Sequence, residues 1–174
     1  MKKVLFLLFA LMAVMTVQAQ SICGSWQLMQ PIVQNDGDGY VMVTYIYTFN
    51  EDGSFFTDAD ITFSTRPAQT KAQEVAFSGT VKGSYTLEGD QLNVFNFNTL
   101  NMDLVSLSEN GKVINDRKLK SKLNNIHNKE AKVKLTELIK GTYTVKVTDN
   151  GRMLELTKKD GTVVRLMRMA LMKH

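Results

Sequence analysis

Residues 40–63 read YVMVTYIYTFNEDGSFFTDADITF, and this stretch decides the fold class. Before its central turn, every second residue is apolar: Val41, Val43, Tyr45, Tyr47 and Phe49. After the turn, the corresponding alternate set is Phe55, Thr57, Ala59, Ile61 and Phe63. Successive side chains of a strand point to opposite faces, so this period of two gives each strand one buried face. Asp52-Gly53 marks a tight turn between the two strands, and the stretch therefore predicts a β-hairpin.

Similar runs of β-branched and aromatic residues lie on both sides of this hairpin. They predict six further strands, at residues 24–33, 75–87, 91–107, 142–148, 152–157 and 162–169. Residues 66–74 form a predicted polar loop. The apolar set changes phase near Asn96, which predicts a β-bulge there. Closing eight antiparallel strands into a barrel removes their exposed edges, so we predict an all-β, eight-stranded antiparallel barrel.

One helical insertion is predicted before the last three strands. Leu119, Leu123 and Ile126 fall at helical spacing, which indicates a helix over residues 115–128. The helix either continues to residue 139 or is followed by a strand at 131–138. Residues 112–140 contain nine Lys or Arg residues against three acidic ones, so this basic segment carries a net charge of +6.

The N-terminus has the pattern of a secretory signal peptide. Lys2 and Lys3 precede an uncharged apolar run at residues 4–17, and Val17-Gln18-Ala19 predicts cleavage after Ala19. The run is too short for a comfortable membrane span, although a retained anchor or an interfacial helix is the alternative. We therefore expect a secreted or periplasmic protein with one mature domain, residues 20–174, and no transmembrane segment.

The single cysteine, Cys23, lies shortly after the predicted cleavage site. Lipid attachment to Cys23 is disfavoured, because Ile22 stands where lipoprotein processing requires a small residue. A lone cysteine also excludes an internal disulfide, so stability must come from the core.

No pattern of catalytic, metal-binding or cofactor-binding residues emerges from the sequence. The histidines are His127 and His174, and Asp58 and Asp60 are explained more simply as solvated strand residues than as cation ligands. Nucleophile and phosphate-loop motifs are lacking. After signal removal, 19 basic residues face 17 acidic ones, which gives nucleic-acid binding little support. We predict a non-enzymatic protein without metal or cofactor.

Gly24-Ser25-Trp26 opens the first strand directly after the signal. This G-x-W, ahead of an eight-strand meander, resembles the lipocalin (calycin) family and its bacterial lipocalin-like members, over residues 24–170. The resemblance implies that Gly24 turns the chain across the closed end of the barrel and that Trp26 plugs that end. It also implies a cation–π contact from the last strand, with Arg168, or failing it Arg165, over the indole.

Two binding functions follow as expectations. The barrel resemblance implies a small hydrophobic ligand inside the barrel, and the inward aromatic residues are the candidate lining: Tyr45, Tyr47, Phe55, Phe63, Phe77, Phe95 and Phe97. These residues could equally fill a solid core. In the alternative, the basic segment binds an acidic partner, a polysaccharide or a lipid head group, through lysines that include Lys118, Lys120 and Lys122.

Overall fold

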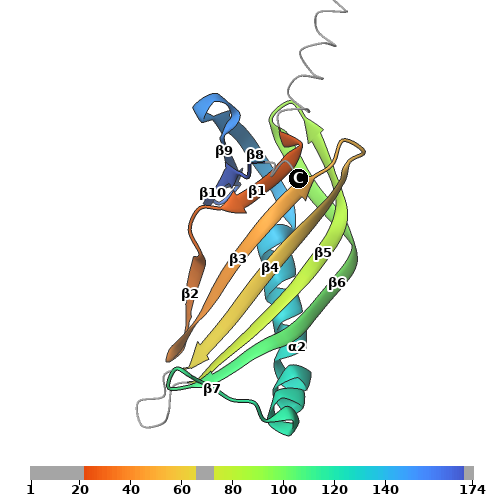
Figure 1. Cartoon of the computed structure of the whole chain (residues 1–174). Coiled ribbons are helices and arrows are strands. Elements are labelled where there is room, and N and C mark those ends of the chain that lie inside the picture. The colour runs from red at the N-terminus through yellow and green to blue at the C-terminus, as the bar shows by residue number, and fades with distance from the viewer. Residues whose placement is uncertain (1–21, 66–72, 171–174) are drawn as a thin grey trace, which may run out of the picture.

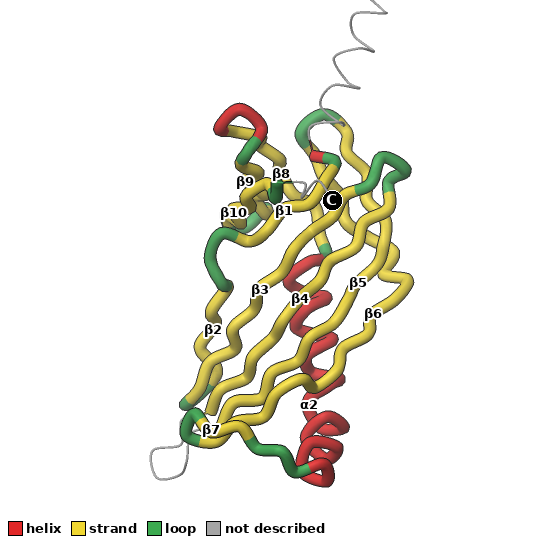
Figure 2. The backbone as a smooth tube through the Cα atoms, in the orientation of Figure 1, coloured by secondary structure: helices red, strands yellow, loops and turns green. Residues whose placement is uncertain are grey.

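A computed structural model of the 174-residue chain describes residues 22–65 and 73–170 (Figures 1 and 2). The predicted signal peptide, its cleavage site and most of the predicted 66–74 loop lie outside the described residues. The strands and helices are β1 (Gly24–Leu28), β2 (Ile32–Asp36), β3 (Gly39–Phe49), β4 (Ser54–Thr65), β5 (Gln73–Glu88), β6 (Gln91–Glu109), β7 (Lys112–Val113), α2 (Arg117–Ile139), β8 (Gly141–Thr148), the 3₁₀ turn η1 (Asp149–Gly151), β9 (Met153–Lys158) and β10 (Val163–Arg168).

The strands form a closed, eight-stranded antiparallel barrel, as predicted. Strands follow the order β1-β10-β9-β8-β6-β5-β4-β3, and β1 pairs with β3 to close the ring. The helix α2 lies before β8, β9 and β10, also as predicted. The barrel is therefore an antiparallel meander that α2 interrupts before its last three strands.

Unequal strand lengths make the two ends of the barrel different. β6 has 19 residues, but it pairs with β8 only through Gln91–Val94. The short strands β1, β8, β9 and β10 thus enclose one end, whereas β3 to β6 extend well past them (Figure 1). In the extended part α2 packs beside the sheet, and Asn128 donates a hydrogen bond to the Met102 carbonyl of β6. The helix thus covers the part of β3 to β6 that the short strands do not reach.

Local chemistry explains the limits of α2. Asp116 is its N-cap, and the carboxylate accepts hydrogen bonds from the backbone of Lys118 and Leu119. At the other end, the Tyr143 hydroxyl of β8 lies 2.7 Å from the Ile139 carbonyl and donates to it. The helix runs without interruption to residue 139, so the alternative strand at 131–138 is wrong.

The helix buries one stripe of its surface against the sheet. Ala131, Leu135 and Ile139 are each fully buried and are spaced four residues apart, which places them on one face. His127 stacks on Phe63 of β4, with ring centroids 5.9 Å apart. These contacts join the helix to the same apolar core that fills the barrel.

The predicted hairpin at residues 40–63 is confirmed. All ten residues of its predicted inward sets are buried, and β3 pairs with β4 from Gly39↔Thr65 to Phe49↔Phe55. The predicted bulge is also confirmed: Asn96 has a φ of +50°, and the register of β5 and β6 shifts opposite Gly83. Gly83 is needed there, because an added Cβ would lie 2.6 Å from the Phe55 ring.

The predicted first strand at 24–33 is wrong in one respect. It is broken at Met29–Pro31 into β1 and β2, and only β1 pairs with β10. Pro31 has no N–H to donate to a ladder, which explains the interruption. Gln73 and Glu74, which were predicted to belong to the 66–74 loop, are instead part of β5.

Candidate functional site

Trp26 of β1 lies in the buried core, between β3 and the last strand, β10. Its side chain is fully buried, and the indole N–H donates to the Ile22 carbonyl at 2.6 Å. The Arg168 guanidinium lies 5.0 Å from the centre of the indole ring and donates to the Cys23 carbonyl at 2.6 Å. The contact expected from Arg168 is therefore present. Gly24 has a φ of +117°, a backbone conformation that favours glycine.

The inward aromatic residues fill the barrel interior. Five of the seven candidate lining residues are buried: Tyr45, Tyr47, Phe55, Phe63 and Phe77. They pack edge-to-face on one another, as in Tyr45 with Tyr47 at 4.9 Å and Phe63 with Phe77 at 6.1 Å between ring centroids. Phe97 packs edge-on against Phe55, whereas Phe95 is half-buried and follows the inward Val94, which places it on the outer face of the sheet beside the bulge. None of the seven lines any of four surface cavities of the described residues, one of which is described below.

Burial shifts the buried tyrosines away from their ordinary titration range. It raises the pKa of Tyr143 to about 12, partly offset by a hydrogen bond with Tyr47. The pKa values of Tyr45 and Tyr47 are raised by burial and by the neighbouring phenols. All three hydroxyls are therefore neutral at physiological pH, and they contribute no charge to the barrel interior.

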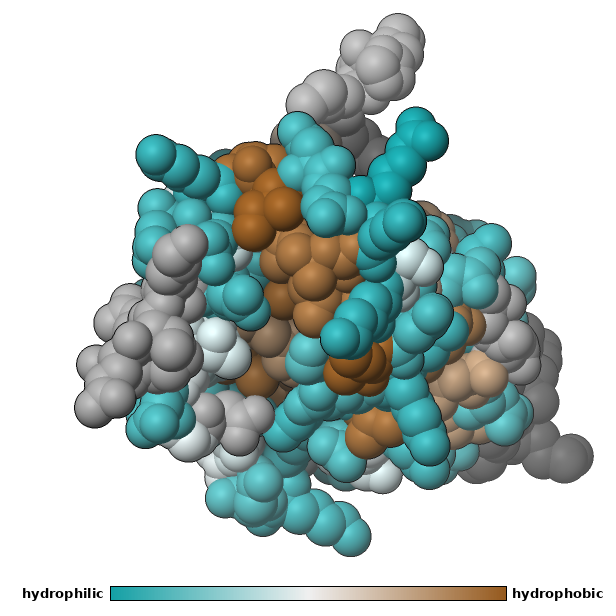
Figure 3. Space-filling view, turned by 90° about the horizontal axis from the view of Figure 1, so that it is seen from below, coloured by the Kyte–Doolittle hydropathy of each residue, from teal (hydrophilic) through white to brown (hydrophobic). Residues whose placement is uncertain are grey.

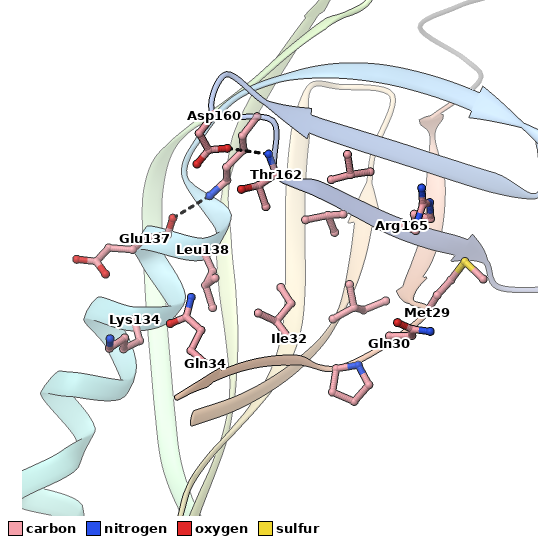
Figure 4. Close-up of a pocket in the computed structure, with 15 residues that line it drawn as sticks. Met29, Gln30, Ile32, Gln34, Lys134, Glu137, Leu138, Asp160, Thr162 and Arg165 are labelled. Atoms are coloured by element: carbon pink, nitrogen blue, oxygen red, sulfur yellow. Dashed lines mark hydrogen bonds between the residues drawn. The ribbon is translucent and has the colours of Figure 1, made fainter. Parts of the chain in front are cut away.

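A cavity of about 630 Å³ lies in the barrel wall where β2 separates from β10 (Figure 4). β1 follows β10 as far as the hydrogen bond from the Met29 N–H to the Arg165 carbonyl. Beyond that point β2 remains paired with β3 but leaves β10, and no described strand pairs with its other edge. The break at Met29–Pro31 thus leaves a gap between β2 and β10. Residues Lys134, Glu137 and Leu138, in the second half of α2, line this gap as well. We call this the β2–β10 cavity.

The β2–β10 cavity has apolar walls and a polar rim. Its apolar lining comes from four elements and the β1–β2 linker: Leu28, Met29, Pro31, Ile32, Leu138, Val163 and Val164. Met29 and Val163 are 46% and 42% exposed, so apolar surface reaches the opening. The polar lining is mixed in charge: Gln30, Gln34, Lys134, Glu137, Lys158, Asp160, Thr162 and Arg165.

Interactions already present hold several rim residues in place. The Lys158 ammonium donates to the Glu137 carbonyl at 3.4 Å and lies 5.7 Å from the centre of the Tyr143 ring. Arg165 pairs with Glu155 at 3.8 Å. The Asp160 carboxylate accepts from the Thr162 N–H, and this hydrogen bond lowers the pKa of Asp160. Several rim residues are therefore held in place before any ligand binds. In the sequence, Pro31 is the one residue that signals the strand break at which the cavity forms.

The predicted lysines of the basic segment do not share one face of α2. Lys118 and Lys122 are four residues apart on one side and are exposed. Lys120 lies about 200° around the helix from Lys118 and is half-buried. The three side chains therefore leave the helix from two different sides.

Residues 22–65 and 73–170 contain neither a metal-binding cluster nor a membrane-spanning helix. No three His, Cys, Asp or Glu side chains gather there closely enough to hold a metal ion. None of the helices in that part of the chain combines the length and the apolar character needed to cross a membrane.

Comparison of the chain with protein-family models gives no match, and comparison with curated protein sequences gives none either.

Proposed function

We propose that this protein is a secreted or periplasmic, lipocalin-like binding protein that holds a small hydrophobic molecule in the β2–β10 cavity. One observation carries the proposal: a cavity of about 630 Å³ with apolar walls opens where the closed barrel splits. Ligand sites for small molecules commonly have volumes of about 300–1,000 Å³, apolar walls and a few polar groups. The proposed role is binding without catalysis.

The position of the cavity differs from a site inside the barrel. The aromatic residues leave the barrel interior filled, whereas Leu28, Ile32 and Val164 meet Leu138 of the helix around open space. A ligand entering there would bury its apolar part against these four side chains. Polar groups at the rim, such as Gln34 and Thr162, would then contact the part of the ligand that stays near water.

Adjacent residues of β2 provide a matched test. Ile32 lines the cavity, whereas Val33 is 58% exposed and does not. Ile32→Trp fills the cavity with an indole, and Val33→Trp adds the same bulk to the outer side of the strand. We expect Ile32→Trp to weaken binding of a fluorescent fatty-acid analogue more than tenfold, with Val33→Trp unchanged. Fluorescence titration measures both affinities, and native mass spectrometry detects co-purified ligand.

Two results would contradict the proposal. One is a wild-type protein that carries no co-purified ligand and binds no fluorescent probe. The other is equal binding by both tryptophan variants, which would place the probe elsewhere. Thermal melts of the variants identify a loss of binding that is caused only by unfolding.

The packing of Ile22 favours a mature chain that keeps this residue, as cleavage after Ala19 would. Ile22 is fully buried, and its carbonyl accepts the indole hydrogen bond of Trp26. Cleavage directly before Cys23, as lipid attachment requires, would remove both interactions from the barrel plug. Intact mass of the exported protein should correspond to a chain that begins at Gln20; a mass that begins at a lipidated Cys23 would refute this.

A further inference from the structure

Cationic and apolar side chains alternate in one stripe along the solvent side of α2. Lys118, Lys122, Ile126, Lys129 and Val133 are spaced by four, four, three and four residues, which keeps them on one helix face. All five are exposed, and we call them the α2 stripe. The stripe extends about 22 Å along the helix axis.

The exposure of two apolar residues in the α2 stripe has no explanation within the fold. Ile126 is 54% exposed and Val133 is 47% exposed, although the helix buries other apolar residues completely. The two line a shallow hollow on the outer side of the helix, together with Lys129, Glu130, Lys134 and Glu137. Figure 3 views the end of the molecule at which α2 begins, and apolar side chains reach the surface there among hydrophilic ones.

The lysines of the α2 stripe have acidic neighbours, Glu130 and Glu137, but no ion-pair partner among the described side chains. The stripe itself contains no acidic residue, and Glu130 on its flank pairs with His127 at 3.3 Å. Among the described side chains, none forms an ion pair with Lys118, Lys122 or Lys129. The positive charge is therefore available to a partner.

We propose that the α2 stripe docks this protein on an anionic lipid surface. Lysines close to an anionic leaflet are attracted to its head groups, and their alkyl stems reach across apolar surface. Ile126 and Val133 project from the same face, so they enter the boundary between head groups and acyl chains when the lysines bind. Helices that lie in the membrane interface likewise combine lysines that contact head groups with apolar side chains that enter the acyl boundary.

The composition of the α2 stripe disfavours the other occupants. A second copy of the chain, packed stripe to stripe, would bring Lys118, Lys122 and Lys129 against identical lysines, and this repulsion opposes a symmetric dimer. An acidic polymer would satisfy the lysines but leave Ile126 and Val133 in water. A lipid surface satisfies both kinds of side chain.

Docking through the α2 stripe would also place the β2–β10 cavity next to the lipid. The hollow at Ile126 and Val133 shares Lys134 and Glu137 with the lining of that cavity. A hydrophobic ligand could then pass between bilayer and cavity over a short path. The docking proposal does not depend on ligand binding, because the exposed stripe exists whether or not the cavity is occupied.

Vesicle co-sedimentation of the exported, processed protein tests the proposal. The whole described fold lies within residues 22–170, so signal cleavage leaves it intact. Wild type should bind vesicles of phosphatidylcholine with about one-third phosphatidylglycerol, and should bind pure phosphatidylcholine vesicles far less. Each lysine near such a surface is worth about a fivefold factor in affinity, so Lys118→Gln/Lys122→Gln/Lys129→Gln should lose roughly two orders of magnitude.

A charge-matched variant separates the α2 stripe from net charge. Lys82→Gln/Lys146→Gln/Lys159→Gln removes the same charge from exposed positions on β5, β8 and the β9–β10 turn, and should bind like wild type. Ile126→Thr/Val133→Thr keeps every charge and should lose several-fold in affinity. Three results would each overturn the proposal. The two lysine variants could lose affinity equally, the threonine variant could bind as well as wild type, or the protein could bind polyglutamate but not vesicles. Binding of the fluorescent probe to the cavity is measured without lipid. A failure of ligand binding can therefore be distinguished from a failure of membrane docking.

Discussion

Replacing Thr57 by valine should stabilise this protein. Thr57 belongs to the inward set of β4 and lies opposite Tyr47 of β3 and Val81 of β5. Its side chain is fully buried, and its hydroxyl oxygen has no hydrogen-bond partner among the described residues. Folding therefore removes this hydroxyl from water without replacing the hydrogen bonds that it made there.

The expected gain follows from the cost of an unsatisfied hydroxyl. Burying such a group costs about 1–3 kcal/mol, and valine places a methyl group in nearly the same volume. We expect Thr57→Val to raise the free energy of unfolding by about 1 kcal/mol, which corresponds to about 2–4 °C in Tm for a domain of this size. Urea denaturation, followed by far-ultraviolet circular dichroism, measures the free energy, and calorimetry measures Tm.

Thr80 is a matched control with the opposite expectation. Its hydroxyl donates to the Asp58 carboxylate at 2.9 Å on the outer face of the sheet. Thr80→Val makes the same chemical change but removes a formed hydrogen bond, so it should be neutral or destabilise by up to about 1 kcal/mol. A Thr57→Val protein that is less stable than wild type by more than about 0.5 kcal/mol would refute the reasoning, since it would reveal a partner for the hydroxyl.

Two further predictions concern the barrel interior and its plug. The pKa of Tyr143 is about 12 in the folded protein and about 10 when unfolded, so its contribution to stability is complete below pH 10 and is lost as the pH rises towards 12. Denaturation midpoints at a series of pH values from about 8 to 11 should fall less steeply for Tyr143→Phe than for wild type, and parallel curves would contradict this assignment. Arg168→Gln should destabilise by about 1–2 kcal/mol in urea denaturation, because it removes the cation–π contact with Trp26 and the hydrogen bond to the Cys23 carbonyl. Arg152→Gln, at another exposed arginine, should cost less than about 0.5 kcal/mol, and equal costs would show that Arg168 does not hold the plug.

The candidate site was harder to predict than the fold. The aromatic residues of β3 and β4 were correctly placed inside the barrel, but periodicity gives only the direction of a side chain. Whether inward residues line a space or fill it depends on which other side chains meet them. Here Tyr47 stacks on Phe49 and packs edge-to-face on Phe55, and α2 adds Leu135 and Ile139 to the same core. The interior is consequently filled.

The sequence by itself determined the features that neighbouring residues encode. Alternation from Tyr40 to Phe63 with Asp52-Gly53 at its centre predicts the hairpin, and the phase change predicts the bulge at Asn96. Both depend on strand period and turn chemistry, which act over a few residues. The helix was equally visible, although its length was left open.

Only the tertiary structure decided where the barrel opens. β6 is 19 residues long and β10 only 6, so the wall is incomplete beyond the short strands. The helix α2 packs into this gap, and the break at Pro31 lets β2 leave β10 and form the cavity. These features depend on matching segments that lie more than 100 residues apart, and no local pattern reports how far such strands stay paired.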